Sequence, residues 1–138
     1  MDDVAANLLP DWVQQARSEL DQKMGLELFR VSPEETVGRM PVEGNTQPYG
    51  LWHGGASAVL AETLGSMSAY AHARPDMIAV GVDLNVTHHR AVREGFVTGT
   101  ATALKLGRTT TMHEIVLVDD HHNRVCTGRL TCQVIKPR

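Results

Sequence analysis

The chain has 138 residues, and 13 Lys and Arg against 16 Asp and Glu give it a formal net charge of −3. The length fits one domain, and 21% charged with 42% apolar residues is typical of a globular protein rather than a disordered one. This charge balance excludes a broad basic face for nucleic acid, and two Trp, two Tyr and two Phe are too few for a base-stacking platform.

The first predicted elements are a helix and two short strands. Apolar residues recur at three- and four-residue steps over residues 10–24, and Gly25 follows as a stop. We therefore expect the N-terminal segment 1–24 to be helical. Residues 26–31 and 36–42 are rich in strand formers and flank a Ser-Pro-Glu-Glu turn.

A long helix and four further strands are predicted after a glycine-rich loop. Residues 56–73 contain no Pro and many Ala, Ser and Leu, which predicts a helix of about five turns. Residues 77–88 alternate strictly, and this pattern places five apolar residues on one face: Ile78, Val80, Val82, Leu84 and Val86. Three more β-rich runs, joined by turns that suit hairpins, cover residues 96–106, 109–118 and 124–135.

These elements predict an α+β fold in which one antiparallel sheet covers a single long helix, within one domain of residues 1–138. The residues of this helix are small and weakly polar on nearly all of its sides, which favours a curled sheet that wraps most of the helix. Such a sheet leaves an edge strand and an open face, and both favour a homo-oligomer.

We expect neither a secretion signal nor a membrane span. The acidic start MDDVAANLLPDW lacks a basic segment before an apolar run, and the small-residue stretch 54–73 is interrupted by Glu62. Cys126 and Cys132 fall in one predicted strand about 20 Å apart, too far for a disulfide. A cytoplasmic protein with reduced cysteines is the resulting expectation.

Glu62 is the first candidate for chemistry. It is the only charged residue between His53 and Arg74 in a helix whose other residues are expected to be buried. A buried, unpaired carboxylate is costly, so it is a candidate base or nucleophile. The alternative is an exposed Glu on the solvent side of the helix, although no other charged residue marks such a side.

His53-Gly54-Gly55 precedes this helix, where free N–H groups suit a carbonyl oxygen that gains charge in a transition state. A plain glycine-rich cap is the alternative. His88 continues the apolar face of the alternating strand, where a packed core histidine is the more common outcome. The seven histidines include no spacing that binds zinc, so no metal site is expected.

The stretch GNTQPYGLWHGGASAVLAETLGSMSAY resembles the active-site segment of hotdog-fold acyl-CoA thioesterases, and GVDLNVTHHRAVREG and LKLGRTT resemble later strands of that family. The similarity is to the branch with the Arthrobacter-type 4-hydroxybenzoyl-CoA thioesterase, which includes PaaI-like aryl-CoA, menaquinone-pathway and enterobactin-pathway enzymes. The family pattern is a Gln, a short loop, His-Gly-Gly and a helix with an acid nine positions after the His. Gln47, His53 and Glu62 match it, and the resemblance, over about residues 40–135, implies a six-stranded hotdog fold.

The resemblance implies hydrolysis of an aryl- or medium-chain acyl-CoA. Glu62 would attack the thioester carbonyl or activate water, the Gly54 N–H would polarise the carbonyl oxygen, and Gln47 and His53 would organise the loop. Substrate contacts are expected from eight further residues: Gly55, Thr63, Ser66, Gly81, His88, Arg90, Gly107 and Arg108. Among these, Arg90 and the Gly107-Arg108 turn are the predicted contacts to the CoA phosphates.

No metal or cofactor is implied, since CoA enters only as part of the substrate. The resemblance implies a tetramer built as a dimer of dimers, with the site between two subunits, so that Glu62 and residues of the third strand come from different chains. Two alternatives stay open: a non-catalytic protein that binds acyl-CoA, and a thioesterase that acts on acyl carrier protein. A hotdog dehydratase would pair Asp and His on a hydration loop, a pattern that this sequence does not match.

Overall fold

The computed structural model describes residues 9–138, so the first eight residues of the predicted helical segment 1–24 lie outside it. A 3-10 helix η1 (Asp11–Ala16) and a short helix α2 (Glu19–Lys23) precede the strands β1 (Glu27–Val31) and β2 (Glu35–Pro41). The long helix α3 (Gly54–Ala73) follows. Four strands complete the chain: β3 (Ile78–His88), β4 (Phe96–Leu106), β5 (Thr110–Val118) and β6 (Arg124–Ile135).

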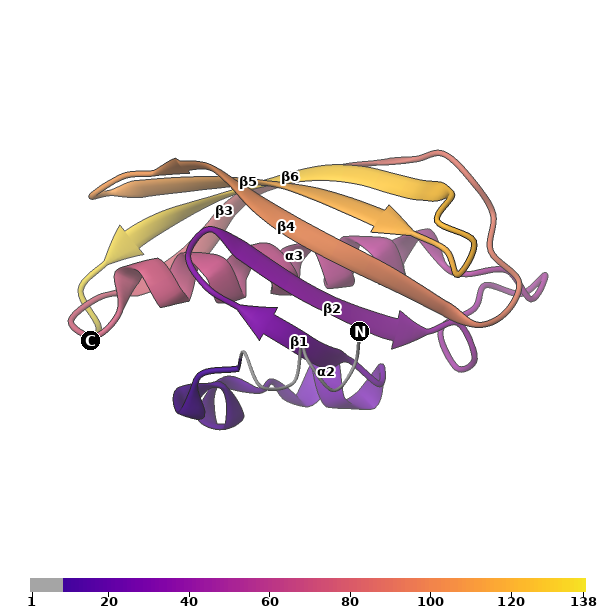
Figure 1. The fold of residues 1–138 in the computed structure, drawn as a ribbon, viewed down its shortest axis with the longest axis horizontal. Coiled ribbons are helices and arrows are strands. Elements are labelled where there is room, and N and C mark those ends of the chain that lie inside the picture. The colour runs from indigo at the N-terminus through magenta and orange to yellow at the C-terminus, as the bar shows by residue number, and fades with distance from the viewer. Residues whose placement is uncertain (1–8) are drawn as a thin grey trace.

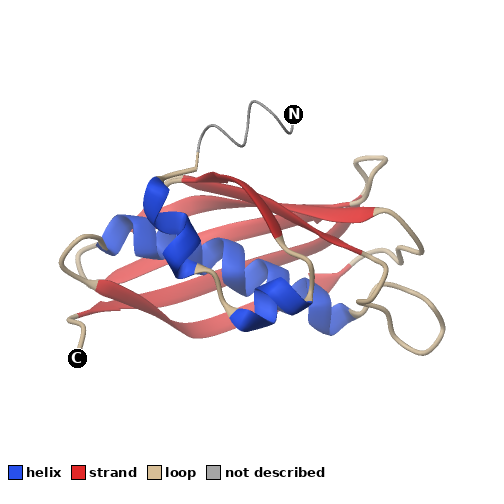
Figure 2. Ribbon diagram, turned by 90° about the horizontal axis from the view of Figure 1, so that it is seen from below, coloured by secondary structure: helices blue, strands red, loops and turns tan. Residues whose placement is uncertain are grey.

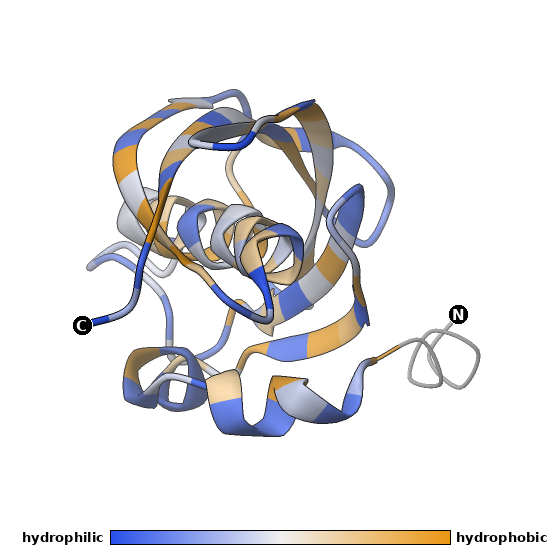
Figure 3. Cartoon of the chain, turned by 90° about the vertical axis from the view of Figure 1, so that its left-hand side faces the viewer, coloured by the Kyte–Doolittle hydropathy of each residue, from blue (hydrophilic) through white to orange (hydrophobic). Residues whose placement is uncertain are grey.

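The six strands form one antiparallel sheet in the order β1-β2-β4-β5-β6-β3, and the sheet curls over α3 (Figure 1). Viewed along the helix axis, α3 lies inside this curl with the N-terminal helices below it (Figure 3). The predicted α+β architecture is confirmed. Strands β1 and β3 are the two edges of the sheet, and among the described helices none is long and apolar enough to cross a membrane.

Small residues let α3 lie close to the sheet. Leu60, Ala61 and Leu64 are fully buried in the main core, and a Cβ added at Gly65 would lie 2.7 Å from a Leu130 methyl of β6. The helix begins two residues earlier than the predicted 56–73, because Gly54 and Gly55 already have helical geometry. Both cysteines are buried on β6 and free, as expected.

The prediction of one helix over residues 10–24 is wrong. Arg17 and Ser18 are extended, with ψ of 131° and 155°, and separate η1 from α2 (Figure 2). The physical reason is Ser18, whose hydroxyl accepts a hydrogen bond from the Asp21 N–H at 3.0 Å and so caps a new helix. The break turns Leu20 outwards, while Val13 is buried in a small cluster with Val31 and Met67.

The strict alternation predicted for the third strand is interrupted by a β-bulge. Gly81 pairs with Cys132 and Asp83 with Thr131, so Val82 has no partner in the ladder to β6. After one extra residue, the side chains of the rest of the strand point to the opposite faces from those that strict alternation predicts.

The prediction that one face of β3 is apolar throughout is therefore wrong for the first half of the strand. Val80 and Val82 are 39% and 58% exposed on the outer side of this edge strand. Three other residues of the strand pack against the core instead: Ala79, Leu84 and Val86. The bulge brings Gly81 to face α3.

A buried histidine ties the β1–β2 turn to the sheet. His113 on β5 is fully buried, and its Nε2–H donates to the Pro33 carbonyl at 2.9 Å. Burial lowers the pKa of His113 from its ordinary value, and the nearby His72 adds to this effect, while the bond to Pro33 opposes it. The folded protein thus holds His113 neutral at a pH where an unfolded chain would bind a proton.

The stability that this neutral His113 contributes is full above its unfolded pKa of about 6.5 and is lost as the pH falls towards the lower folded value. We expect His113→Gln, which does not titrate, to lose less free energy of unfolding between pH 7 and pH 5 than the wild type, although it starts about 1–2 kcal/mol lower. Urea unfolding at a series of pH values measures this difference. Exposed His121→Gln serves as the control, and an equal slope for all three proteins would contradict the assignment.

Candidate active site

The start of α3 is an open N-terminal cap. His53 is extended, and its Nδ1 accepts a hydrogen bond from the Gly55 N–H at 2.7 Å, which requires a neutral ring with its proton on Nε2. The Gly55 donor is therefore occupied. The Gly54 N–H forms no hydrogen bond with any residue in the described part of the chain, and it points out of the positive end of the helix.

The loop before this cap is held by Asn45 and Trp52, which the sequence did not single out, and by Gln47, which it did. Asn45 is buried, donates to two backbone carbonyls at 2.8 Å, and accepts from the His53 N–H at 2.9 Å. Trp52 is buried beside it and donates its indole N–H to Ser57 Oγ at 2.7 Å. The side-chain carbonyl of Gln47 accepts from the Tyr49 N–H. These bonds fix the position of the free N–H of Gly54.

A first cavity, of about 380 Å³, lies at this end of α3, and Gln47, Gly54, His88 and Arg90 are among its lining residues. His88 reaches across from the end of β3, so that a Cβ added at Gly54 would lie 2.9 Å from His88 Nε2. The structure thus brings together four of the predicted site residues around one free backbone donor. Arg90 is exposed, and its Nε lies 3.9 Å from Asp119 Oδ2.

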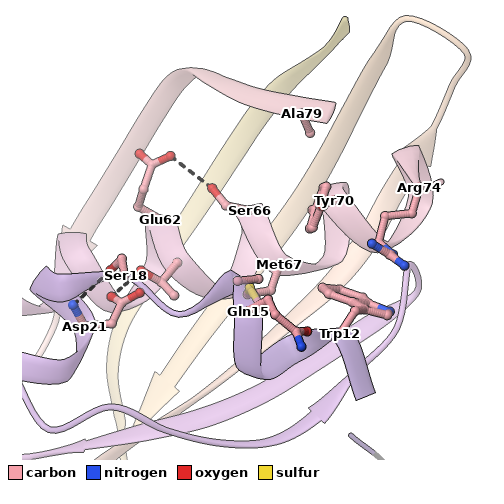
Figure 4. Close-up of a pocket in the computed structure, with 12 residues that line it drawn as sticks. Trp12, Gln15, Ser18, Asp21, Glu62, Ser66, Met67, Tyr70, Arg74 and Ala79 are labelled. Carbon is pink, nitrogen blue, oxygen red and sulfur yellow. Dashed lines mark hydrogen bonds between the residues drawn. The ribbon is translucent and has the colours of Figure 1, made fainter. Parts of the chain in front are cut away.

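Glu62 lines a different cavity, of about 510 Å³, between α3, β3 and the N-terminal helices (Figure 4). It is half-buried, and Ser66 one turn further along donates to Glu62 Oε2 at 3.3 Å. Thr63 also lines the cavity, but its hydroxyl donates to Asp21 Oδ1 at 2.7 Å. Asp21 is a buried carboxylate that the sequence analysis missed, because no local pattern indicates that α2 docks beside Glu62.

The carboxylate of Glu62 is held against β3 and β6. A Cβ added at Gly81 would overlap Glu62 Oε2, so the glycine leaves room for the acid. On the neighbouring strand, burial raises the pKa of the Cys132 thiol, and the Glu62 carboxylate raises it further. Gly81, predicted as a substrate contact, therefore lies beside the candidate catalytic carboxylate itself.

We expect Gly81→Ala to lower kcat by about 10²-fold, because a displacement of about 1 Å at a reacting group costs that much. The free energy of unfolding should change by less than about 1 kcal/mol, since the side-chain end of Glu62 can move aside. Thiol release and thermal unfolding measure the two effects. Thr102→Ala, at an exposed position of β4, is the control; equal activity of both variants would show that the position of Glu62 does not depend on Gly81.

Two predicted phosphate contacts lie away from this cavity. Gly107 and Arg108 form the β4–β5 turn, where the Gly107 carbonyl is 2.7 Å from His72 Nε2 near the end of α3. His72 is 18 residues beyond Gly54, about 27 Å along the helix. Arg90 and Arg108 therefore do not meet within this chain. Over residues 9–138, no group of three or more His, Cys, Asp or Glu is placed to hold a metal ion.

Comparisons with known proteins show a family relationship. A family model described as the thioesterase superfamily matches residues 49–126, which include the cap, α3, the strands β3, β4 and β5 and the start of β6. The chain is 44% identical to the proofreading thioesterase EntH of Cronobacter turicensis over 117 residues, covering 84% of this chain and 85% of the relative. EntH of Cronobacter sakazakii is 43% identical over 115 residues, covering 83% of this chain and 84% of that protein.

Solved structures of thioesterases superimpose on this chain. The thioesterase HI1161 of Haemophilus influenzae superimposes with a TM-score of 0.84 at 34% identity, over 89% of this chain and 87% of that one. A mutant of the thioesterase PA1618 of Pseudomonas aeruginosa superimposes with a TM-score of 0.84 at 35% identity, over 96% and 99% of the two chains.

Proposed function

The chain belongs to the thioesterase superfamily and has its hotdog fold, and on that premise we propose that it hydrolyses an acyl-CoA thioester to the free acid and CoA. The observation that carries the proposal is Glu62, a half-buried carboxylate on the wall of a cavity large enough for an acyl group. The carbonyl would be polarised by the Gly54 N–H. An acyl carrier protein is the alternative source of the thioester.

We further propose that each site takes Gly54 from one protomer and Glu62 from another. The two residues are eight positions apart on one helix, about 12 Å along its axis. The Gly54 N–H points away from Glu62, and the carboxylate oxygens of a Glu reach only about 5 Å from its Cα through three C–C bonds and one C–O bond. A carbonyl oxygen about 3 Å from the Gly54 nitrogen is therefore out of reach of Glu62 in the same chain.

The edge strand β3 offers a place for a second copy. Val80 and Val82 expose apolar side chains there, and β3 has a free hydrogen-bonding edge. Pairing two such edges would bury that surface by a two-fold contact. This arrangement supports a homodimer as the smallest active unit, and pairing of dimers would give the tetramer that the family resemblance implies.

The reaction then follows from the placed groups. Glu62 takes a proton from water as the hydroxyl oxygen attacks the thioester carbon, and the negative charge formed on the carbonyl oxygen is stabilised by the Gly54 N–H. The tetrahedral intermediate collapses, the C–S bond breaks, and the CoA thiolate leaves. Glu62 as a direct nucleophile would form an anhydride that water hydrolyses. Ser66 orients the carboxylate in either route, and Gln47, His53 and His88 surround the carbonyl and leaving group.

The test is thiol release from a panel of benzoyl-, hydroxybenzoyl-, phenylacetyl- and C6–C16 acyl-CoAs, with the same acyl groups on acyl carrier protein. We expect hydrolysis of CoA esters, and the highest kcat/KM identifies the acyl class. Hydrolysis of carrier-protein esters alone would favour the alternative carrier. Binding of CoA esters without any hydrolysis would contradict the catalytic proposal and favour a binding protein.

A further inference from the structure

The cavity beside Glu62 has opposite charges at its two ends (Figure 4). Glu62 and the buried Asp21 lie at one end, and Arg74 lies at the other. Arg74 follows α3 directly, 12 residues after Glu62, which is about 18 Å along the helix. The floor between them carries the apolar side chains of Met67 and Tyr70. A ligand in this cavity thus meets carboxylates at the thioester end and a guanidinium at the far end.

Arg74 is held in place by two aromatic rings rather than by an acid. Its Cζ lies 4.7 Å from the centroid of the Trp12 ring and 5.6 Å from that of Tyr70, and these rings pack edge to face at 5.2 Å. Among the residues that the structure describes, no carboxylate forms an ion pair with Arg74. The rings orient the planar guanidinium without neutralising it, which leaves its N–H donors for a ligand.

We propose that Arg74 is a specificity-determining residue that binds a carboxylate at the far end of the acyl group. The preferred substrate is then a thioester of a dicarboxylic acid, with one carboxyl group bound to the thiol and the other free. The inference rests on the proposed thioesterase reaction at Glu62. It adds the chemical class of the acyl group, which the reaction at Glu62 alone leaves open.

The distance between Glu62 and the guanidinium of Arg74 sets the length of the acyl chain. The side chain of Arg74 turns back towards Glu62, so that its guanidinium lies near the ring of Tyr70. Tyr70 is eight residues beyond Glu62, about 12 Å along the helix. An extended chain advances about 3.5 Å for every three bonds, so an acyl group of about eight to ten carbons spans this distance. Asp21 and Glu62 would repel a free carboxylate at the thioester end, so the charge pattern also fixes the orientation of the acyl group.

The experiment compares matched pairs of CoA thioesters: octanoyl with the octanedioic half-thioester, and decanoyl with the decanedioic one. For each pair, the ratio of kcat/KM for the carboxylated over the neutral ester is measured by thiol release. We expect the ratio to exceed 1 in the wild type and to fall about tenfold or more in Arg74→Gln, as for loss of a charge-assisted bidentate contact. Arg74→Lys, which keeps the charge, should restore part of the ratio.

Two further variants separate this role from general damage. Trp12→Leu removes one ring that orients the guanidinium and should also lower the ratio. Arg17→Gln changes an exposed arginine of the same N-terminal segment that does not line the cavity, and should leave the ratio at its wild-type value. Thermal unfolding shows whether each variant is folded.

The outcomes distinguish the inference from the proposed function. Equal loss of kcat/KM for both esters in Arg74→Gln would place Arg74 at a CoA phosphate and overturn the inference, as would a wild-type ratio of 1. Absence of hydrolysis of every ester would overturn the proposed function instead. Calorimetric binding of the same pairs to Glu62→Gln needs no turnover, so equal affinities for carboxylated and neutral esters would overturn the role of Arg74 in that case too.

Discussion

Glu62→Gln is expected to lower kcat for acyl-CoA hydrolysis by about 10²- to 10⁴-fold, the usual contribution of a general base. The amide has the size of the carboxylate, and its oxygen can still accept the hydrogen bond from Ser66, so the cavity keeps its shape. What it loses is the ability to take a proton from water or to attack carbon. Thiol release under saturating substrate measures the loss.

Glu114→Gln, on the exposed side of β5, is the matched control and should retain wild-type kcat. Full activity of Glu62→Gln with an unchanged unfolding temperature would assign the chemistry to another group. A single turnover in water labelled with heavy oxygen separates the two routes left open above. General-base catalysis places the label only in the released acid, whereas a Glu62 anhydride that water opens at Glu62 Cδ places it in the protein carboxylate.

The long helix and the hairpins could be predicted because local pattern determines them, whereas the pairings of β2 with β4 and of β3 with β6 are not local. The long helix follows from an uninterrupted run of small helix formers, and each hairpin follows from a strand pattern bounded by turn residues. The errors fall where one residue changes the geometry without changing the composition. Ser18 starts a second helix inside an apparently continuous pattern, and Val82 forms a bulge inside a perfect alternation.

The candidate site, too, could be predicted where its residues are close in sequence and not where they are distant. The spacing from His53 to Glu62 is readable because His53 caps the helix that carries Glu62, and the cap is a contact between residues two positions apart. Asp21 and Arg74 were not predicted as site residues, because their importance depends on how the N-terminal helices dock onto α3. Neither a carboxylate 42 residues from its Thr63 partner nor an arginine stacked on a tryptophan 62 residues away leaves a local pattern.

Gly54→Pro is expected to lower kcat by about 10²- to 10³-fold, the usual cost of removing one oxyanion donor. Proline has no N–H, yet it suits the first position of a helix. The preceding His53 already has the extended geometry that proline requires, with φ of −75° and ψ of 130°, so α3 should form normally. Gly54→Ala is the control for bulk, because it keeps the N–H while its Cβ approaches His88 Nε2. Equal loss in both variants would show that crowding, not the donor, matters.

The same two inactive proteins test whether each site spans two protomers. If the Gly54 donor and the Glu62 carboxylate act across the interface, a dimer of one Glu62→Gln and one Gly54→Pro chain has one site with both defects and one site with none. Random pairing makes half of the dimers mixed, so co-expression should restore roughly a quarter of wild-type activity per dimer. If both groups act within one chain, every site in the mixed dimer carries a defect, and activity should stay at the level of the separate variants.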